Sequence, residues 1–360
     1  MVIFNQFATH TRAIKTIDMK QINISADNTI EILEEIKVII GGHIKSTWGE
    51  HKLIVNSHIA KGSIKFIPFD WGVSMLQYNI TFYDDIDIEI KATEFNPIRF
   101  IYNSGDTFQH KFGVDNTQKN IEQFQSVIFT NKTNGTNCIS FKKDTKAYMN
   151  VIQIVRQKFL KKRTTNIASL NEKLYEVFVD TDHNQRFFHH GTLNLRIADY
   201  VKSIKKVKSK GMVKFLKIEA KVYEILTLHI QEHNNASQGV TLPTSLIKRE
   251  LKIVRRLSKQ INESPEQPYT LEQLSQESGL SQVKLQDGFK FLFNRTVTEY
   301  IRHVRLETSR ELIRTTDLNI SQIVYTIGFT SRSYFSKIFK AKYGITPYEY
   351  KKQVYIPIAV

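Results

Sequence analysis

Two glycines in the C-terminal third, Gly279 and Gly328, most constrain how this 360-residue chain can fold. Each interrupts apolar residues at helical spacing, and each is followed within three residues by a serine that can cap a new helix. Glycine takes up the left-handed conformation that ends a helix without a steric penalty. The sequence therefore predicts, twice, a pair of short helices joined by a tight corner.

Both predicted pairs carry the same helix-start signals. A capping residue and a Gln three positions later, which together form a capping box, precede the first helix of each pair, and a serine precedes the second helix. These residues are, in chain order, Thr270, Gln273 and Ser281, and then Asn319, Gln322 and Ser331. Residues 296–316, between the pairs, have the pattern of one amphipathic helix of roughly 25–30 Å.

Two short helices joined by a glycine turn form a helix-turn-helix, whose second helix enters the DNA major groove. In the second unit, polar side chains fall opposite the apolar stripe: Arg332, Ser333, Ser336, Lys337 and Lys340. Arg332 and Lys337 can donate to guanine O6 and N7. The connecting helix is long enough to set the two units about one DNA turn apart, near 34 Å.

The starts of the two second helices are candidate phosphate contacts, because free backbone N–H groups and the helix dipole favour an anion there. The residues concerned are Ser281, Lys284 and Ser331. The alternative is a helical bundle in which the glycine turns only connect helices. Repetition of the same caps, corner and polar outer face favours DNA binding over that alternative.

The distribution of charge points to the same class of partner. The net charge is +16, and from Ser245 to the end 19 Lys and Arg stand against 11 Asp and Glu. The last 116 residues thus carry as much net positive charge as the first 244. A polyanion is the expected partner, with nucleic acid ahead of a membrane.

The rest of the chain predicts an α+β protein. Residues 1–154 contain many short alternating segments, typical of a β-barrel or sandwich, and residues 155–233 change to helical periodicity. A polar linker is expected over 234–246, a helical DNA-binding domain over 247–352 and a tail over 353–360. The single cysteine, Cys138, excludes an internal disulfide and favours the cytoplasm, and no apolar run is long enough to span a membrane.

The stretch from about Leu251 to Lys352 resembles the DNA-binding domain of AraC/XylS-type transcription regulators. FTSRSYFSKIFKAKYGITPYEYK (329–351) is similar to that family's signature, and RLETSRELI (305–313) resembles its linker helix. A fainter likeness, in GLSQVKLQDGFKFLFNRTVTEYI and LKIEAKVYEILTLHI, points to the branch containing the pyochelin regulator PchR.

The resemblance implies base contacts from Val283, Gln286 and Asp287 in the first unit and from Arg332, Ser333, Ser336 and Lys337 in the second. Asp287 departs from the family pattern, in which a basic residue is common. A carboxylate can accept from cytosine N4 but is repelled by phosphate. The resemblance also implies an N-terminal β-barrel sensor, often cupin-like, with helices that serve dimerisation.

Enzymatic and metal-binding alternatives have little support in the sequence. His51 and His58 are seven residues apart, His110 stands alone, and His189 is adjacent to His190, so no metal-ligand set is predicted. No phosphate-cradling glycine loop occurs, and no cofactor or catalytic residue is predicted.

We therefore expect a cytoplasmic, bacterial, ligand-responsive activator that binds double-stranded DNA. RNA polymerase, a small-molecule effector and a second copy of the chain are candidate partners, and no residue is assigned to the effector. The main alternative is a constitutive DNA binder whose N-terminal half serves only oligomerisation. A cupin-type enzyme is the remote alternative.

Overall fold

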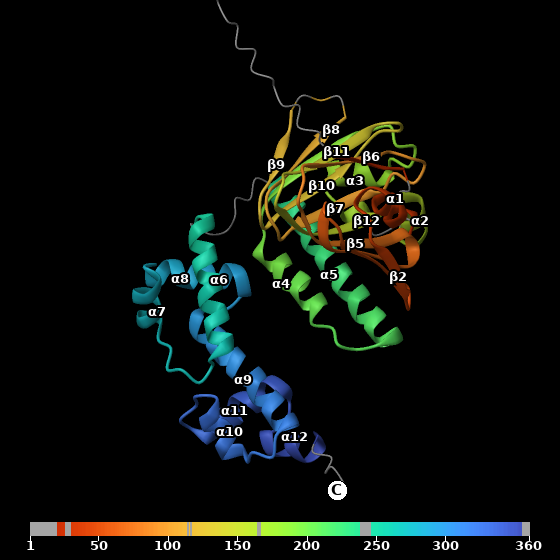
Figure 1. Ribbon diagram of the computed structural model, residues 1–360. Coiled ribbons are helices and arrows are strands. Elements are labelled where there is room, and N and C mark those ends of the chain that lie inside the picture. Colours follow the sequence, from red (N-terminus) through yellow and green to blue (C-terminus); the bar gives the residue numbers. More distant parts are fainter. Residues whose placement is uncertain are drawn as a thin grey trace, which may run out of the picture. The chain divides into compact units, whose positions relative to one another are not determined.

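Figure 1 shows the computed structural model of the protein, which describes residues 20–25, 30–113, 115, 117–163, 167–237 and 246–354. The chain divides into two compact units, residues 1–239 and 240–360. This division falls within the expected linker 234–246, although helix α5 (Gly211–Ser237) includes the first four linker residues. The rest of that linker up to residue 245, and residues 355–360 of the expected tail, lie outside the described residues.

The N-terminal unit is built on two β-sheets. The larger sheet has eight antiparallel strands in the order β13-β10-β7-β12-β5-β4-β3-β2. The smaller sheet has the order β1-β6-β11-β8-β9, in which only the β1–β6 pair is parallel. The strands are β1 (Lys20–Ile24), β2 (His43–Thr47), β3 (Glu50–Asn56), β4 (Ala60–Pro68), β5 (Val73–Phe82), β6 (Ile86–Lys91), β7 (Ile98–Asn103), β8 (Phe108–Phe112), β9 (Lys119–Ile121), β10 (Gln125–Thr130), β11 (Thr136–Phe141), β12 (Thr145–Ile154) and β13 (Phe187–Leu193).

The predicted β-rich N-terminal domain is confirmed, but within the described residues its two sheets do not close into the barrel that the resemblance implied. Among the described residues, β2 and β13 end the larger sheet, and β1 and β9 end the smaller one. Closure would require hydrogen bonding between such edges, which no strand pairing supplies here. The domain is therefore a pair of packed sheets with open edges.

The larger sheet is buried on both faces, as the fully buried strand β7 shows. One face shares an apolar core with the smaller sheet and helix α1 (Glu31–Ile40). The other face packs under α5 and its neighbours in a second core. The remaining helices of the unit are α2 (Arg156–Arg163), α3 (Glu172–Val179) and α4 (Leu195–Lys205), with 3₁₀ turns at Asp70–Gly72 and Ile167–Ser169.

Two elements depart from the expected order of strands followed by helices. Helix α1 lies within the region predicted as β-rich, and strand β13 lies within the region predicted as helical. Strand β13 pairs with β10, about 60 residues earlier in the chain, so its pairing is a long-range contact that local periodicity does not reveal.

Three histidines lie where β13 meets α5. The rings of His189 and His233 have centroids 4.5 Å apart, and His229 is buried with neither ring nitrogen hydrogen-bonded. Burial lowers the pKa of His229 to about 3 and that of His189 to about 4. These two rings are therefore neutral at pH 7.

We expect acid to destabilise the N-terminal unit progressively from about pH 6.5 to about pH 3, the interval between the unperturbed and the lowest buried histidine pKa values. In that interval the unfolded chain binds more protons than the folded one, so stability falls as the pH falls. Replacing His229 with Phe removes one titrating ring and should flatten the decline. Both tryptophans, Trp48 and Trp71, lie in this unit, so fluorescence-detected unfolding of the full chain at several pH values measures it. An equally steep decline in the variant would contradict the expectation.

The C-terminal unit is entirely helical over its described residues, as predicted. Its helices are α6 (Lys248–Glu263), α7 (Leu271–Ser278), α8 (Gln282–Phe293), α9 (Val297–Thr315), α10 (Ile320–Thr326), α11 (Arg332–Tyr343) and α12 (Pro347–Val354). Helix α9 matches the predicted connecting helix 296–316 and contacts α8 on one side and α10 and α12 on the other. It therefore contributes to the apolar cores of both halves of the unit.

Candidate nucleic-acid interface

The first helix-turn-helix is formed by α7 and α8. The Thr270 hydroxyl accepts from the backbone N–H of Gln273, and the Gln273 side chain accepts from the Thr270 N–H, both at 3.1 Å. Gly279 ends α7 in the left-handed conformation with φ 69°, and the Ser281 hydroxyl caps α8 by accepting from the Lys284 N–H. The predicted caps and corner are thus confirmed.

The second helix-turn-helix, α10 and α11, repeats this geometry. Asn319 and Gln322 form the predicted capping box at 2.9 and 2.8 Å. Gly328 has φ 81°, and the Ser331 hydroxyl caps α11 by accepting from the Tyr334 N–H. Both turns therefore rest on short-range hydrogen bonds that the sequence determines locally.

Both second helices bury one face and expose the other. Helix α11 buries Phe335 and Phe339, and α8 buries Leu285, Phe289 and Leu292. Of the predicted DNA contacts, those exposed are Ser281, Val283, Ser331, Arg332, Ser333, Lys337 and Lys340, whereas Lys284, Gln286, Asp287 and Ser336 are half-buried. The first unit thus presents fewer fully exposed polar side chains than the second.

Three of the predicted DNA contacts already have partners inside the unit. Arg332 donates from Nη1 to the hydroxyl of Ser321 at 2.8 Å. The Gln286 amide oxygen accepts from the backbone N–H at the start of α9 at 3.1 Å. Lys284 forms an ion pair with Glu250 of α6 at 2.5 Å. Leaving a neutral hydroxyl costs less than leaving a carboxylate, so Arg332 is better placed than Lys284 to exchange its partner for DNA.

Arg305 of α9 joins the two halves of the unit. Its guanidinium donates to the backbone oxygens of Pro265 and Gln267, which precede α7, and of Gly328 at the second corner, at 2.8, 2.8 and 2.9 Å. It also lies over the ring of Phe329 at 5.5 Å. The planar five-donor fork of arginine makes this three-way contact feasible. Sequence reasoning gave Arg305 no role, because its partners are backbone atoms distant in the chain.

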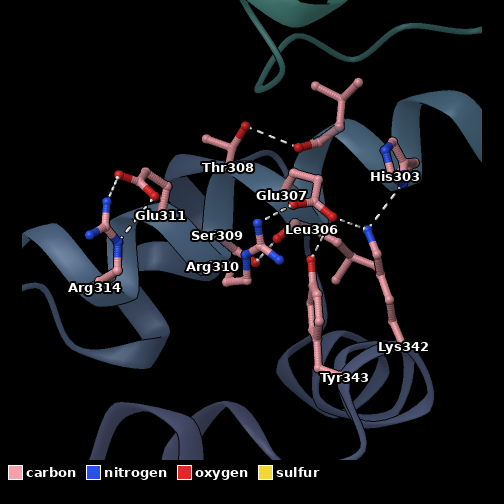
Figure 2. A network of polar contacts seen from close by, with 11 residues as sticks. His303, Leu306, Glu307, Thr308, Ser309, Arg310, Glu311, Arg314, Lys342 and Tyr343 are labelled. Carbon is pink, nitrogen blue, oxygen red and sulfur yellow. Dashed lines mark hydrogen bonds and ion pairs between the residues drawn. The ribbon is translucent and has the colours of Figure 1, made fainter. Parts of the chain in front are cut away.

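Glu307 of α9 fixes the C-terminal end of α11, as Figure 2 shows. Its carboxylate pairs with Lys342 at 2.7 Å and with Arg310 at 2.8 Å, and accepts from the Tyr343 hydroxyl at 3.2 Å. Burial alone would raise the pKa of Glu307, but the hydrogen bond and charge of Lys342 outweigh it and lower the pKa. Glu307 is therefore ionised at neutral pH and holds the second recognition helix against α9.

A hollow of about 460 Å³ lies between the two helix-turn-helix units. The capping residues Thr270 and Ser331 line it, together with Thr298 and Arg302 of α9. Hydroxyls and a guanidinium are groups that bind phosphate in protein–DNA complexes. Arg302 and Thr298 are thus further candidate contacts, which sequence analysis missed because it treated α9 only as a spacer.

Candidate metal-binding clusters and membrane-spanning helices are both absent from the described part of the chain. There, no group of three or more His, Cys, Asp or Glu side chains could hold a metal ion. Within the same residues, no helix combines the length and apolar character needed to cross a bilayer.

Two glycine-cornered helix pairs, each with an exposed second helix, define a double helix-turn-helix protein. The helix-turn-helix domain family matches residues 274–353. The regulatory protein SoxS of Salmonella typhimurium is 31% identical over 102 residues, which cover 28% of this chain and 95% of SoxS. The transcriptional regulator AlkR of Acinetobacter baylyi is 32% identical over 93 residues, covering 26% of this chain and 30% of AlkR.

The chain belongs to the AraC/XylS family of DNA-binding transcription regulators, as the resemblance predicted. Histidine kinase P4 of Formosa agariphila is 42% identical over 79 residues, but these are 22% of this chain and 6% of that kinase. The chain thus spans a small part of the kinase and under a third of AlkR, and nearly all of SoxS. Assignment to the PchR branch stays a prediction.

Among solved structures, the C-terminal domain of AraT, a response regulator from Geobacillus stearothermophilus, is 28% identical. The match covers 30% of this chain and 90% of the AraT domain, with a TM-score of 0.29. An AraC-type regulator from Chromobacterium violaceum is 26% identical and covers 31% of this chain and 96% of that chain, with a TM-score of 0.27.

Proposed function

We propose that this chain is a ligand-responsive activator of transcription that binds DNA through α8 and α11 together. The observation that carries the proposal is the attachment of both helix-turn-helix units to one helix. Arg305 ties the start of the first unit to the corner of the second, and Glu307 ties α11 to α9. Two recognition helices held on one rigid element can enter successive major grooves on one side of a duplex.

Within this proposal, α11 supplies most of the base contacts. Arg332 and Lys337 are exposed and can donate to guanine, while Ser333 and Ser336 contact bases or phosphate. In α8, Val283 can contact a thymine methyl group, and Gln286 and Asp287 offer amide and carboxylate groups to base edges. The residues assigned to phosphate are Ser281, Lys284, Thr298, Arg302, Ser331 and Lys340.

The N-terminal unit is proposed to sense a small molecule and to assist dimerisation. Apolar side chains at the start of α5 support the second role, because Met212, Val213 and Leu216 are at least half exposed. A ligand acts on transcription only if it binds the DNA-competent arrangement better than the alternative. We further propose that the protein works in the cytoplasm, contacts RNA polymerase and is not an enzyme.

Genomic footprinting with and without candidate small molecules tests this function. Discrete protected sites whose occupancy changes with one compound are expected. Protection that is unchanged by every compound would favour a constitutive binder, and an absence of discrete sites would contradict sequence-specific regulation.

Replacing Arg332 with alanine should weaken binding to the preferred site by about 1–3 kcal/mol and relax its sequence preference at one position. Arg332 is exposed and donates to a neutral hydroxyl, so its removal should leave α11 folded. Binding titrations on the preferred site and on variants with single base changes measure both effects. If binding weakens equally on every sequence, Arg332 contacts phosphate instead.

A further inference from the structure

A second hollow, of about 230 Å³, lies in the N-terminal unit and is lined by none of the residues assigned to DNA. Its walls come from β8 and β9 of the smaller sheet and from the start of β13 in the larger sheet. Because β9 and β13 are edge strands, the hollow lies where the two sheets fail to close. The gap between these two sheet edges is therefore large enough for a small ligand.

Aromatic rings form the inner wall of this hollow. His110 is buried and stacks on Phe188, with ring centroids 5.0 Å apart and an angle of 25° between the ring planes. Phe112 stands edge-on to His110 at 5.0 Å. The Asn137 side-chain oxygen lies 3.4 Å from His110 Nε2 and helps fix the ring. Phe112 and Phe188 are only half-buried, so these two rings, and not the buried His110, form the apolar wall that a further ring could contact.

Cations line the outer part of the same hollow. Lys119 lies 4.0 Å above the Phe188 ring and Arg186 lies 4.6 Å from the Phe112 ring. Arg186 also pairs with Asp115 at 2.8 Å, and Lys111 adds a third positive charge. Three cations against one carboxylate give a local excess of positive charge, which favours an anionic guest.

We propose that this hollow binds a small aromatic carboxylate, with its ring against Phe188 and Phe112 and its carboxylate on Arg186 and Lys119. The guest carboxylate would take the place of Asp115 on the Arg186 guanidinium, exchanging one ion pair for another. The hollow is smaller than the roughly 300–1,000 Å³ of drug-sized sites, so a single ring with a short acidic substituent is the fitting size.

The regulatory meaning of this site rests on the proposed sensing function, and strand β13 provides a route for it. The strand carries Phe188 in the hollow and, four residues later, Thr192, whose hydroxyl donates to Glu232 of α5 at 3.0 Å. The other oxygen of Glu232 accepts from Ser126 of β10 at 2.5 Å. Helix α5 is the last element of the unit, so a shift of β13 would reach the end of the N-terminal unit.

Isothermal titration of the full chain tests the site with benzoate as the probe. Cyclohexanecarboxylate, which lacks the aromatic ring, benzyl alcohol, which lacks the charge, and inorganic phosphate serve as comparison compounds. We expect benzoate to bind at least about tenfold more tightly than each of them, because only benzoate satisfies both the rings and the cations. Equal affinity for phosphate, or no binding of benzoate at millimolar concentration, would overturn the proposal.

Substitutions locate the binding. Arg186→Met and Lys119→Met should each weaken benzoate by about tenfold, and Asp115→Asn should strengthen it because Arg186 is released. Lys45→Met on the opposite edge strand, β2, is the matched control and should leave benzoate affinity unchanged. Tryptophan fluorescence confirms that each variant is folded. Benzoate affinity that is unchanged in both Arg186→Met and Lys119→Met would place the probe elsewhere and refute the site.

Footprinting in parallel separates this inference from the function on which it rests. If benzoate does not bind but discrete DNA sites are still protected, only the benzoate site is refuted. Benzoate binding without any DNA protection would leave the site standing and remove the proposed function.

Discussion

Gly328→Ala is expected to destabilise the C-terminal unit by about 2–5 kcal/mol, whereas Gly279→Ala should cost only about 1–2 kcal/mol. Both glycines have a left-handed backbone, with φ 81° and 69°, so both substitutions incur the strain of that conformation. They differ in the space available. A Cβ at Gly279 would meet nothing within 4 Å, but at Gly328 it would lie 2.5 Å from the backbone oxygen of Glu266.

Hydrogen exchange of the full chain, read from peptides covering α7–α8 and α10–α11, measures both costs separately. We expect the second pair to lose protection in Gly328→Ala while the first pair loses less in Gly279→Ala. The two substitutions share residue type and a left-handed backbone, so the comparison reports mainly the difference in space at the two corners. Equal losses of protection in the two variants would show that the close contact with the Glu266 backbone oxygen does not add to the cost of Gly328→Ala.

Arg305→Ala is expected to reduce affinity for a two-element DNA site by about 100-fold, equivalent to about 3 kcal/mol. The substitution leaves the backbone oxygens of Pro265, Gln267 and Gly328 without their shared donor. Each helix-turn-helix keeps its own caps and apolar contacts, so both should stay folded while their relative orientation loosens. Binding to the same site with one element scrambled should change much less, because only one unit is then engaged.

Arg305→Lys provides the control for charge. Lysine keeps the positive charge but cannot donate to three carbonyls in a fork, so it should behave like alanine on the two-element site. If lysine restored full affinity, Arg305 would act through long-range attraction to phosphate. Binding titrations at several salt concentrations distinguish phosphate attraction from orientation of the two helix-turn-helix units. Loss of a phosphate contact reduces the salt dependence of binding, whereas loss of the fixed orientation between the units does not.

The parts of the fold that sequence predicted correctly are those determined by neighbours in the chain. The Thr270–Gln273 and Asn319–Gln322 boxes and the two glycine corners depend on residues within one or two turns of each other. The alternating sequence DIDIEIKA (85–92), within the region predicted as β-rich, likewise corresponds to β6. Local chemistry is sufficient for these elements.

The remaining features depend on partners distant in sequence. Whether two sheets close into a barrel is decided by which edges meet, and no local pattern in β9 or β13 reports this. The role of Arg305 depends on carbonyls up to 40 residues away. Gln286 and Lys284 could be assigned to the outer face of α8, but their contacts with the start of α9 and with Glu250 could not be foreseen from spacing.

Helix α9 belongs to the cores of both halves of the C-terminal unit, and this limits how its target can evolve. Changing the separation of α8 and α11 would require rebuilding two hydrophobic cores at once. If α8 and α11 both contact DNA, as proposed, new operators can be acquired by replacing side chains on the exposed faces of these helices, while the spacing between the two subsites is conserved. Duplexes with another pitch would have to bend or overtwist, which makes their stiffness part of the recognition.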